Sequence, residues 1–94
     1  IDVIRVENFV GEEGVGRELV LVKVNADSQT RAEITQICDV FRGKIIDVAP
    51  NSLIIEATGN ENKIKAFLNL LDSFGISELA RTGTVSLRRG SQNI

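Results

Sequence analysis

The side chains that this sequence lacks limit the chemistry it could perform. Its 94 residues include no His, Trp, Tyr or Met and a single Cys, Cys38. Without His, a Ser/His/Asp triad and a Cys/His pair are excluded, as are most transition-metal sites. The remaining candidates for proton transfer are Asp47 and Glu56, which could lie side by side across a hairpin. Because a catalytic carboxylate pair needs a pocket that shifts its pKa values, we interpret both as solvated side chains.

The sequence also lacks the residues that usually bind phosphate, metal ions or RNA. Gly59-Asn60 is too short for a phosphate cradle and is typical of a turn followed by a helix N-cap. A single Cys excludes a Cys-x-x-Cys metal site, and the apolar strands have no aromatic residues on which bases could stack. The net charge of −2 gives no basic footprint. We therefore expect no metal or cofactor in this chain and no nucleic-acid partner.

The sequence also shows no features of a membrane or secreted protein. No stretch reaches the ~18 apolar residues of a membrane span, and no leader resembles a signal peptide. We therefore expect no membrane association and a cytoplasmic location, with Cys38 as a buried, unreactive thiol in a reducing compartment. Because the chain begins with Ile1 and has no Met, we expect a processed chain or a fragment.

The stretch Arg17–Asn25 predicts the central strand of the fold. Five of the six residues from Leu19 to Val24 are aliphatic. In a strand the three valines share one face, and Leu19, Leu21 and Lys23 share the other. Two largely apolar faces indicate a strand with neighbours on both sides. The sequence alone leaves open which face is covered by helices.

Two helices follow from hydrophobic residues spaced three and four apart. The first stripe is Ile34, Ile37, Cys38 and Phe41, with Thr30 and Glu33 predicted to form a capping box and Gly43 to end the helix. The second stripe is Ile64, Phe67, Leu68 and Leu71, with Asn60 as N-cap and Gly75 as the stop.

Strands are predicted at Lys44–Ala49, Ser52–Thr58 and Ile76–Arg81. The first two are joined by the Pro50-Asn51 turn and must form an antiparallel hairpin. The order strand, helix, strand, strand, helix, strand predicts an α+β fold, a ferredoxin-like βαββαβ plait. Its four-stranded antiparallel sheet would carry both helices on one face, with the first and third strands central. Thr82-Gly83 interrupts the last strand, and Thr84–Arg88 is strand-like again.

The ends of the chain are predicted to lie outside this domain. Ile1–Val6 is a short strand-like run, and Glu7–Gly16 is typical of a linker. Either Ile1–Val6 is the last strand of a preceding domain, or it adds to the main sheet. Residues 90–94 are a polar tail.

Two surfaces are candidates for a protein interface. The sheet face away from the helices retains apolar residues, and small soluble proteins rarely leave such a face uncovered. If the valines face the helices, this open face includes Leu19, Leu21 and Ile54. The second candidate is the edge around the interruption, with Arg81, Thr82, Gly83, Arg88 and Arg89. A bulged edge with solvated arginines is the alternative interpretation. Together with the small core, these surfaces predict a homodimer or higher homo-oligomer.

Seven short motifs in order resemble the C-terminal domain of the acetolactate synthase (acetohydroxyacid synthase) small regulatory subunit. They are Arg17–Ala26, Arg31-Ala-Glu33, Val40-Phe-Arg42, Ile46-Asp-Val48, Glu56-Ala-Thr-Gly59, Phe74-Gly-Ile76 and Ala80-Arg-Thr-Gly83. The resemblance covers residues 17–89. Ile1–Val6 also resembles the last strand of the ACT domain that precedes it in such subunits, so residues 1–16 would be the end of that domain plus a linker.

The resemblance implies a non-catalytic domain that binds and activates the catalytic large subunit in branched-chain amino-acid biosynthesis. The cofactors it implies, thiamine diphosphate, a divalent metal and FAD, would lie in that partner. It also implies that the site for feedback by amino acids lies in the ACT domains, and it admits a plastid location if the source is a plant. The alternative from another class is a stand-alone plait that binds an amino-acid effector at a dimer interface.

Overall fold

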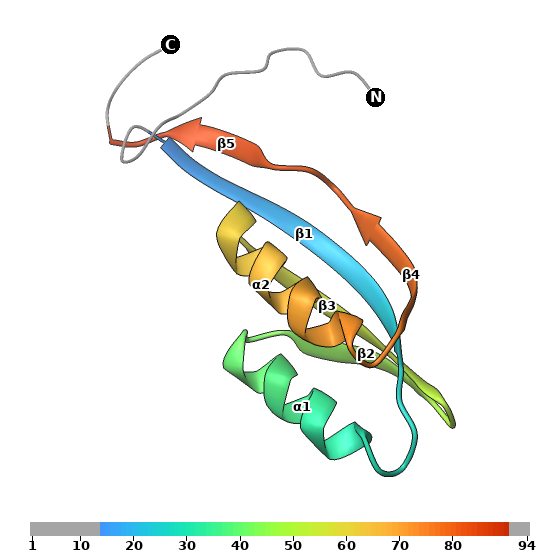
Figure 1. Ribbon diagram of the computed structural model, residues 1–94. Helices are drawn as coiled ribbons and strands as arrows, with labels where there is room; N and C mark the ends of the chain where they lie inside the picture. Colours follow the sequence, from blue (N-terminus) through green and yellow to red (C-terminus); the bar gives the residue numbers. More distant parts are fainter. Residues whose placement is uncertain (1–13, 91–94) are drawn as a thin grey trace.

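The computed structural model describes residues 14–90, which form five strands and two helices (Figure 1). In chain order these are β1 (Gly14–Asn25), α1 (Arg31–Val40), β2 (Lys44–Ala49), β3 (Ser52–Gly59), α2 (Glu61–Asp72), β4 (Ile76–Arg81) and β5 (Val85–Arg88). The predicted α+β plait is confirmed. No helix within these residues is long and apolar enough to cross a membrane.

The sheet is antiparallel, with the strand order β2-β3-β1-β4. The two most apolar strands, β1 and β3, are therefore central, and β2 and β4 are the edges, as predicted. β5 is a fifth strand that lies off this path and pairs with the start of β1. Residues 82–84 separate it from β4, where the sequence predicted an interruption.

The valine face of β1 is the one that the helices cover. Val20, Val22 and Val24 are fully buried. Because residues directly opposite each other in a sheet project to the same side, Val22 and its partner Ile55 belong to one layer. Both helices pack on this side, α1 against β2 and α2 against β1 and β3. The helices contribute the buried residues Ile34, Cys38, Ile64, Phe67 and Leu71.

The predicted capping box at the start of α1 is wrong. Thr30 is the N-cap residue, but its side chain makes no capping hydrogen bond to the helix. Instead Asp27 Oδ1 accepts from the backbone N–H groups of Gln29 (2.8 Å) and Thr30 (2.9 Å). These bonds lower the pKa of Asp27, with Thr30 the largest cause. A short side chain that bonds to the backbone two and three residues ahead stabilises a turn before the helix.

The end of α1 also differs from the prediction that Gly43 closes it. Arg42 takes the left-handed conformation, with φ 58°. Its N–H donates to the Asp39 carbonyl (3.1 Å), and Gly43 N–H donates to the Cys38 carbonyl (2.8 Å). This bond pair is a Schellman motif. Gly43 is needed for space instead, because a Cβ there would lie 3.1 Å from Cys38 Sγ and 3.2 Å from Ile55 Cγ2.

The ends of α2 agree with the prediction. Asn60 Oδ1 accepts from the backbone N–H of Lys63 at 2.8 Å, which satisfies one of the free donors at the helix start. Gly75, with φ 97°, follows the helix in a conformation that favours glycine. Its carbonyl accepts from Asn25 N–H at 2.8 Å, which joins the turn after α2 to the end of β1.

The predicted linker and tail lie mostly outside the described residues. Ile1–Val6 and residues 7–13 are not described, nor are residues 91–94 of the tail. Gly14, Val15 and Gly16, which the sequence assigned to the linker, instead belong to β1. They pair with β5, so the glycines of this stretch are part of a ladder.

Cys38 should react slowly with thiol reagents in the folded protein. Its side chain is buried on α1, and burial raises the pKa of the thiol, with a smaller contribution from the Asp39 carboxylate. Since the thiolate is the reactive form, both accessibility and ionisation oppose labelling. Ellman's reagent at pH 8 should therefore label the native chain much more slowly than the chain in denaturant. Rapid stoichiometric labelling of the native chain would contradict the burial of Cys38.

Candidate interaction surfaces

The open face of the sheet collects the apolar residues that the helices do not cover. Leu19, Leu21 and Ile54 project to this side, opposite the buried valines, as predicted for the case in which the valines face the helices. Leu21 is 37% exposed, and Leu19 and Ile54 are partly buried. Leu21 lies opposite Ala80 of β4. The three candidate residues therefore lie together on adjacent central strands.

Charges of both signs surround this apolar group. Lys23 Nζ forms an ion pair with Glu78 Oε2 at 3.2 Å across β1 and β4. On the other side, Glu56 lies opposite Lys44, whereas Asp47 lies opposite Ile54 because a bulge shifts the register between Ile45 and Asp47. Asp47 and Glu56 are therefore not direct cross-strand partners. In the central strands, Leu21 lies opposite Glu56 and Ile54 opposite Lys23, so apolar and charged side chains lie next to each other on the open face.

Arg81, a candidate for partner contact, forms an ion pair within the domain. Its Nε and Nη2 donate to the two carboxylate oxygens of Glu18 at 2.9 and 2.8 Å. The Glu18 side chain is only 4% exposed, whereas that of Arg81 is 42% exposed. Paired N–H donors that match a carboxylate make a strong, oriented interaction. Charge reversal at Arg81 would therefore disturb the fold as well as any interface.

The ion pair with Arg81 favours the deprotonated form of Glu18. The hydrogen bonds from Arg81 are the main cause of a lowered Glu18 pKa, and burial opposes them without cancelling them. The charge of Arg81 and a hydrogen bond from the Gly83 backbone lower this pKa further. The same pair raises the pKa of Arg81. Glu18 is thus a buried carboxylate that stays ionised and holds the end of β4 and the following turn against β1.

Thr82 and Gly83 carry the chain from β4 to β5. Thr82 N–H donates to the Leu19 carbonyl at 3.0 Å, and Thr82 Oγ1 accepts from Leu19 N–H at 3.0 Å. Gly83 has φ 80°, and a Cβ there would meet no atom within 4 Å. Glycine is therefore required here for its backbone conformation alone. In this structure, Thr82 and Gly83 shape the turn and contact β1.

Arg88 and Arg89 lie on a two-stranded projection that the sequence did not predict. We call residues 14–17 and 84–90, in which Gly14–Arg17 pairs with Val85–Arg88, the β1–β5 ribbon. It extends past the beginning of α2 (Figure 1). β3 ends at Gly59, opposite Glu18, so in the described structure these β1 residues pair with β5 alone. Val85 and Leu87 are 68% and 76% exposed.

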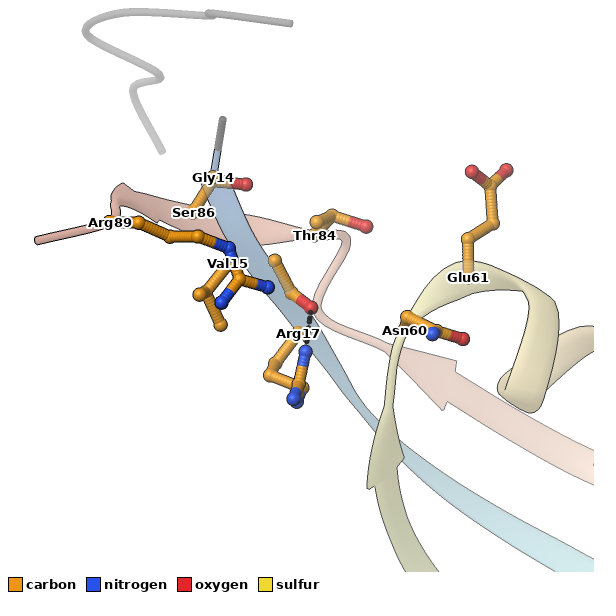
Figure 2. A pocket seen from close by; sticks show the side chains of 9 residues that line it. Gly14, Val15, Arg17, Asn60, Glu61, Thr84, Ser86 and Arg89 are labelled. Atoms are coloured by element: carbon orange, nitrogen blue, oxygen red, sulfur yellow. Dashed lines mark hydrogen bonds between the residues drawn. The ribbon is translucent and has the colours of Figure 1, made fainter. Parts of the chain in front are cut away.

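A shallow hollow lies between the ribbon and the start of α2 (Figure 2). Two of its polar side chains bond within the chain: Arg17 Nη1 donates to the Gly16 carbonyl at 2.8 Å, and Asn60 caps α2. A Cβ on Gly16 would lie 2.9 Å from Thr84 Cγ2, so the strands approach closely here. Residues 14–90 contain no group of three or more His, Cys, Asp and Glu side chains that could hold a metal.

Sequence reasoning missed Glu18 as a buried group. The signal was available, because Glu18 is in phase with Val20, Val22 and Val24 and therefore falls on the covered face. A carboxylate on a buried face needs a partner. The sequence could not identify that partner, since Arg81 is 63 residues away in the chain.

Comparisons with known proteins agree with the resemblance. A family model described as the small subunit of acetolactate synthase matches residues 17–90. The chain is 50% identical over 95 residues to a probable acetolactate synthase small subunit from Methanothermobacter thermautotrophicus, covering 100% of this chain and 56% of that protein. It is 49% identical over 89 residues to the chloroplastic acetolactate synthase small subunit 2 of Arabidopsis thaliana, covering 95% of this chain and 19% of that one.

A solved structure gives the same result. The crystal structure of the acetolactate synthase small subunit from Thermotoga maritima matches with a TM-score of 0.82 and 44% sequence identity. The match covers 90% of this chain and 52% of that chain. The chain thus spans about half the length of several of the relatives it matches.

Proposed function

The chain belongs to the acetolactate synthase small-subunit family, and we propose that it forms part of a non-catalytic regulatory subunit that binds and activates the catalytic large subunit. In this proposal the enzyme serves the biosynthesis of valine, leucine and isoleucine. Thiamine diphosphate, a divalent metal and FAD are bound by the catalytic partner. The family match over residues 17–90 is the observation that carries the proposal.

The structure supports a role in protein association. Apolar side chains are exposed on the open sheet face and on the β1–β5 ribbon, where Val85 is 68% and Leu87 76% exposed. Large exposed apolar side chains that gather on one surface are typical of protein contacts. We propose that residues 17–89 form the regulatory-subunit domain, with residues 1–16 as the end of an ACT domain plus linker and 90–94 as a tail. We also propose a cytoplasmic location, or a plastid for a plant source.

Synthase assays test this function directly. Acetolactate formation by the large subunit from the same source should increase when this chain is added. Activation should persist in valine, because an effector shifts an equilibrium only through different affinities for its two states, and we propose that the amino-acid site lies in the part of the relatives outside this match. No activation and no binding would contradict the proposed function. A saturable shift of the melting temperature by valine on this chain alone would favour the effector-binding alternative.

Self-association through the open sheet face is a separate prediction. A twofold interface brings one patch onto itself, and the mixed charges around Leu21 allow each positive group to meet a negative one. Leu21→Glu should weaken the dimer at least about tenfold, or roughly 1.4 kcal/mol. Val40→Glu is the matched control, because Val40 is 76% exposed on α1. Sedimentation equilibrium measures both, and a wild-type chain that stays monomeric at high micromolar concentration would contradict the prediction.

A further inference from the structure

The β1–β5 ribbon has one apolar face. In the pairing, Val15 lies opposite Leu87 and Arg17 opposite Val85, so these four side chains project to the same side. The other side carries Gly14, Gly16, Ser86 and Arg88. An isolated two-stranded ribbon is marginally stable in water. A projecting ribbon with Val85 and Leu87 mostly exposed therefore has an apolar face suited to a partner.

The ribbon is also the most basic part of the chain. Residues 14–17 and 84–90 contain Arg17, Arg88 and Arg89 and no acidic residue, so they carry a net charge of +3. The whole chain has a net charge of −2, so the remaining residues together carry −5. Figure 2 shows Arg17 and Arg89 on the ribbon, with Glu61 on α2 directed away from them. A partner of complementary charge would present carboxylates here.

A second copy of this chain is a poor occupant for the ribbon. A twofold contact through the ribbons would bring two +3 segments together, and like charges at an interface oppose association. The open sheet face around Leu21 has mixed charges and no such penalty. Val15 and Arg17 are in phase with Leu19 and Leu21 along β1, so the apolar side of the ribbon continues the open side of the sheet. The two parts differ in charge, and we therefore assign a second copy to the sheet around Leu21 and a different protein to the ribbon.

We propose that the ribbon docks on the catalytic large subunit, at a site where apolar side chains are flanked by carboxylates. This inference rests on the proposed function, since it names the surface that makes the contact. Val85 and Leu87 supply the apolar contact, and Arg89 supplies charge that steers association. Residues of the helix exteriors make no part of this contact.

Binding of this chain to the large subunit, measured by calorimetry and by a kinetic biosensor, tests the inference. Val85→Ser/Leu87→Ser should weaken binding at least about tenfold, because the apolar contact is lost. Arg89→Glu should slow association and reduce its dependence on salt. Lys65→Glu makes the same charge change on the exposed side of α2 and should leave affinity within about twofold of wild type. Thermal melting of each variant shows whether the fold is retained.

Four other outcomes would contradict the inference, and one of them would also contradict the proposed function. If the wild-type chain binds and the ribbon variants bind equally well, the ribbon assignment is wrong and the proposed function stands. If the wild-type chain does not bind, both are wrong. If the serine variant loses self-association and keeps its affinity for the large subunit, the occupant is a second copy. If the ribbon variants only lower the melting temperature of the isolated chain, the occupant is residues 1–13, whose net charge is −3. These last two outcomes also overturn the inference.

Discussion

Phe67→Ala should lower the free energy of unfolding by about 3–5 kcal/mol, the usual cost of deleting a buried aromatic ring. The Phe67 side chain is fully buried on α2. It belongs to the cluster that includes Val22 of β1 and Ile55 of β3, so the substitution leaves a cavity between the helix and the two central strands. Since small domains are stable by only about 5–15 kcal/mol, this one change should remove a large part of the stability.

Phe41→Ala is the matched comparison. The two rings lie 5.2 Å apart between centroids, so both variants lose the same ring contact. Phe41 is only partly buried, and its loss should be smaller, about 1–3 kcal/mol. Urea unfolding followed by circular dichroism measures both variants, and a loss below about 1 kcal/mol for Phe67→Ala would mean that α2 does not cover the sheet.

Arg81→Leu should destabilise the domain at neutral pH and reverse part of its pH dependence. The Glu18 carboxylate is 4% exposed and accepts two hydrogen bonds from Arg81. Without the guanidinium it keeps only the bond from the Gly83 backbone. A buried acceptor that loses its partner costs about 1–3 kcal/mol, and more when it is charged. Stability at pH 7 should therefore fall by at least this amount.

The sign of the pH effect follows from the Glu18 pKa. In the wild-type chain this pKa is below its ordinary value of 4.5, mainly because of the Arg81 hydrogen bonds. The pair's contribution is thus fully present above about pH 4.5 and is lost as the pH falls through the folded pKa. In Arg81→Leu, burial dominates and raises the Glu18 pKa above its unfolded value. The variant should then become more stable as the pH falls from 7 toward 5. In the wild-type chain, Glu18 contributes no change in stability over this pH range.

Two controls isolate the pair. Glu18→Gln/Arg81→Leu removes the buried charge and should lose the extra pH dependence between pH 7 and 5. Lys23→Leu breaks an ion pair whose Glu78 side chain is 72% exposed, and it should change stability by less than about 1 kcal/mol. Urea midpoints at a series of pH values measure all four proteins. If Arg81→Leu loses stability on acidification in parallel with the wild type, Glu18 is not held by Arg81.

Local patterns in the sequence were enough to determine most of the fold. The alternation from Leu19 to Val24 placed the central strand, because successive side chains in a strand project to opposite faces. The three- and four-residue spacing around Cys38 and Phe67 placed the helices, and the Pro50-Asn51 turn forced the hairpin. Asn60 was predicted as an N-cap because its short polar side chain can bond to the backbone three residues ahead. These features depend on neighbours within a few residues, so the sequence contains what is needed.

The residues that cap and end the helices were less predictable, because several neighbouring residues could form the same capping hydrogen bonds. Thr30 was predicted to cap α1 by its side chain, yet Asp27 accepts the backbone N–H groups instead. Arg42, with φ 58°, takes the left-handed position after α1 that glycine usually fills, and Gly43 is used where space is short. The space at Gly43 is limited by Cys38 of α1 and Ile55 of β3, a contact between segments that the local pattern does not contain.

The candidate surfaces needed the tertiary structure because their partners are far apart in the chain. The sequence predicted apolar residues for one open face, but burial of Val20, Val22 and Val24 decided that Leu19, Leu21 and Ile54 form it. Arg81 could be placed at an edge but not against Glu18, 63 residues away. The stretch 14–16 has the composition of a linker. Only its pairing with β5 makes it a strand, because hydrogen bonds between distant segments can order residues that have no strong local preference.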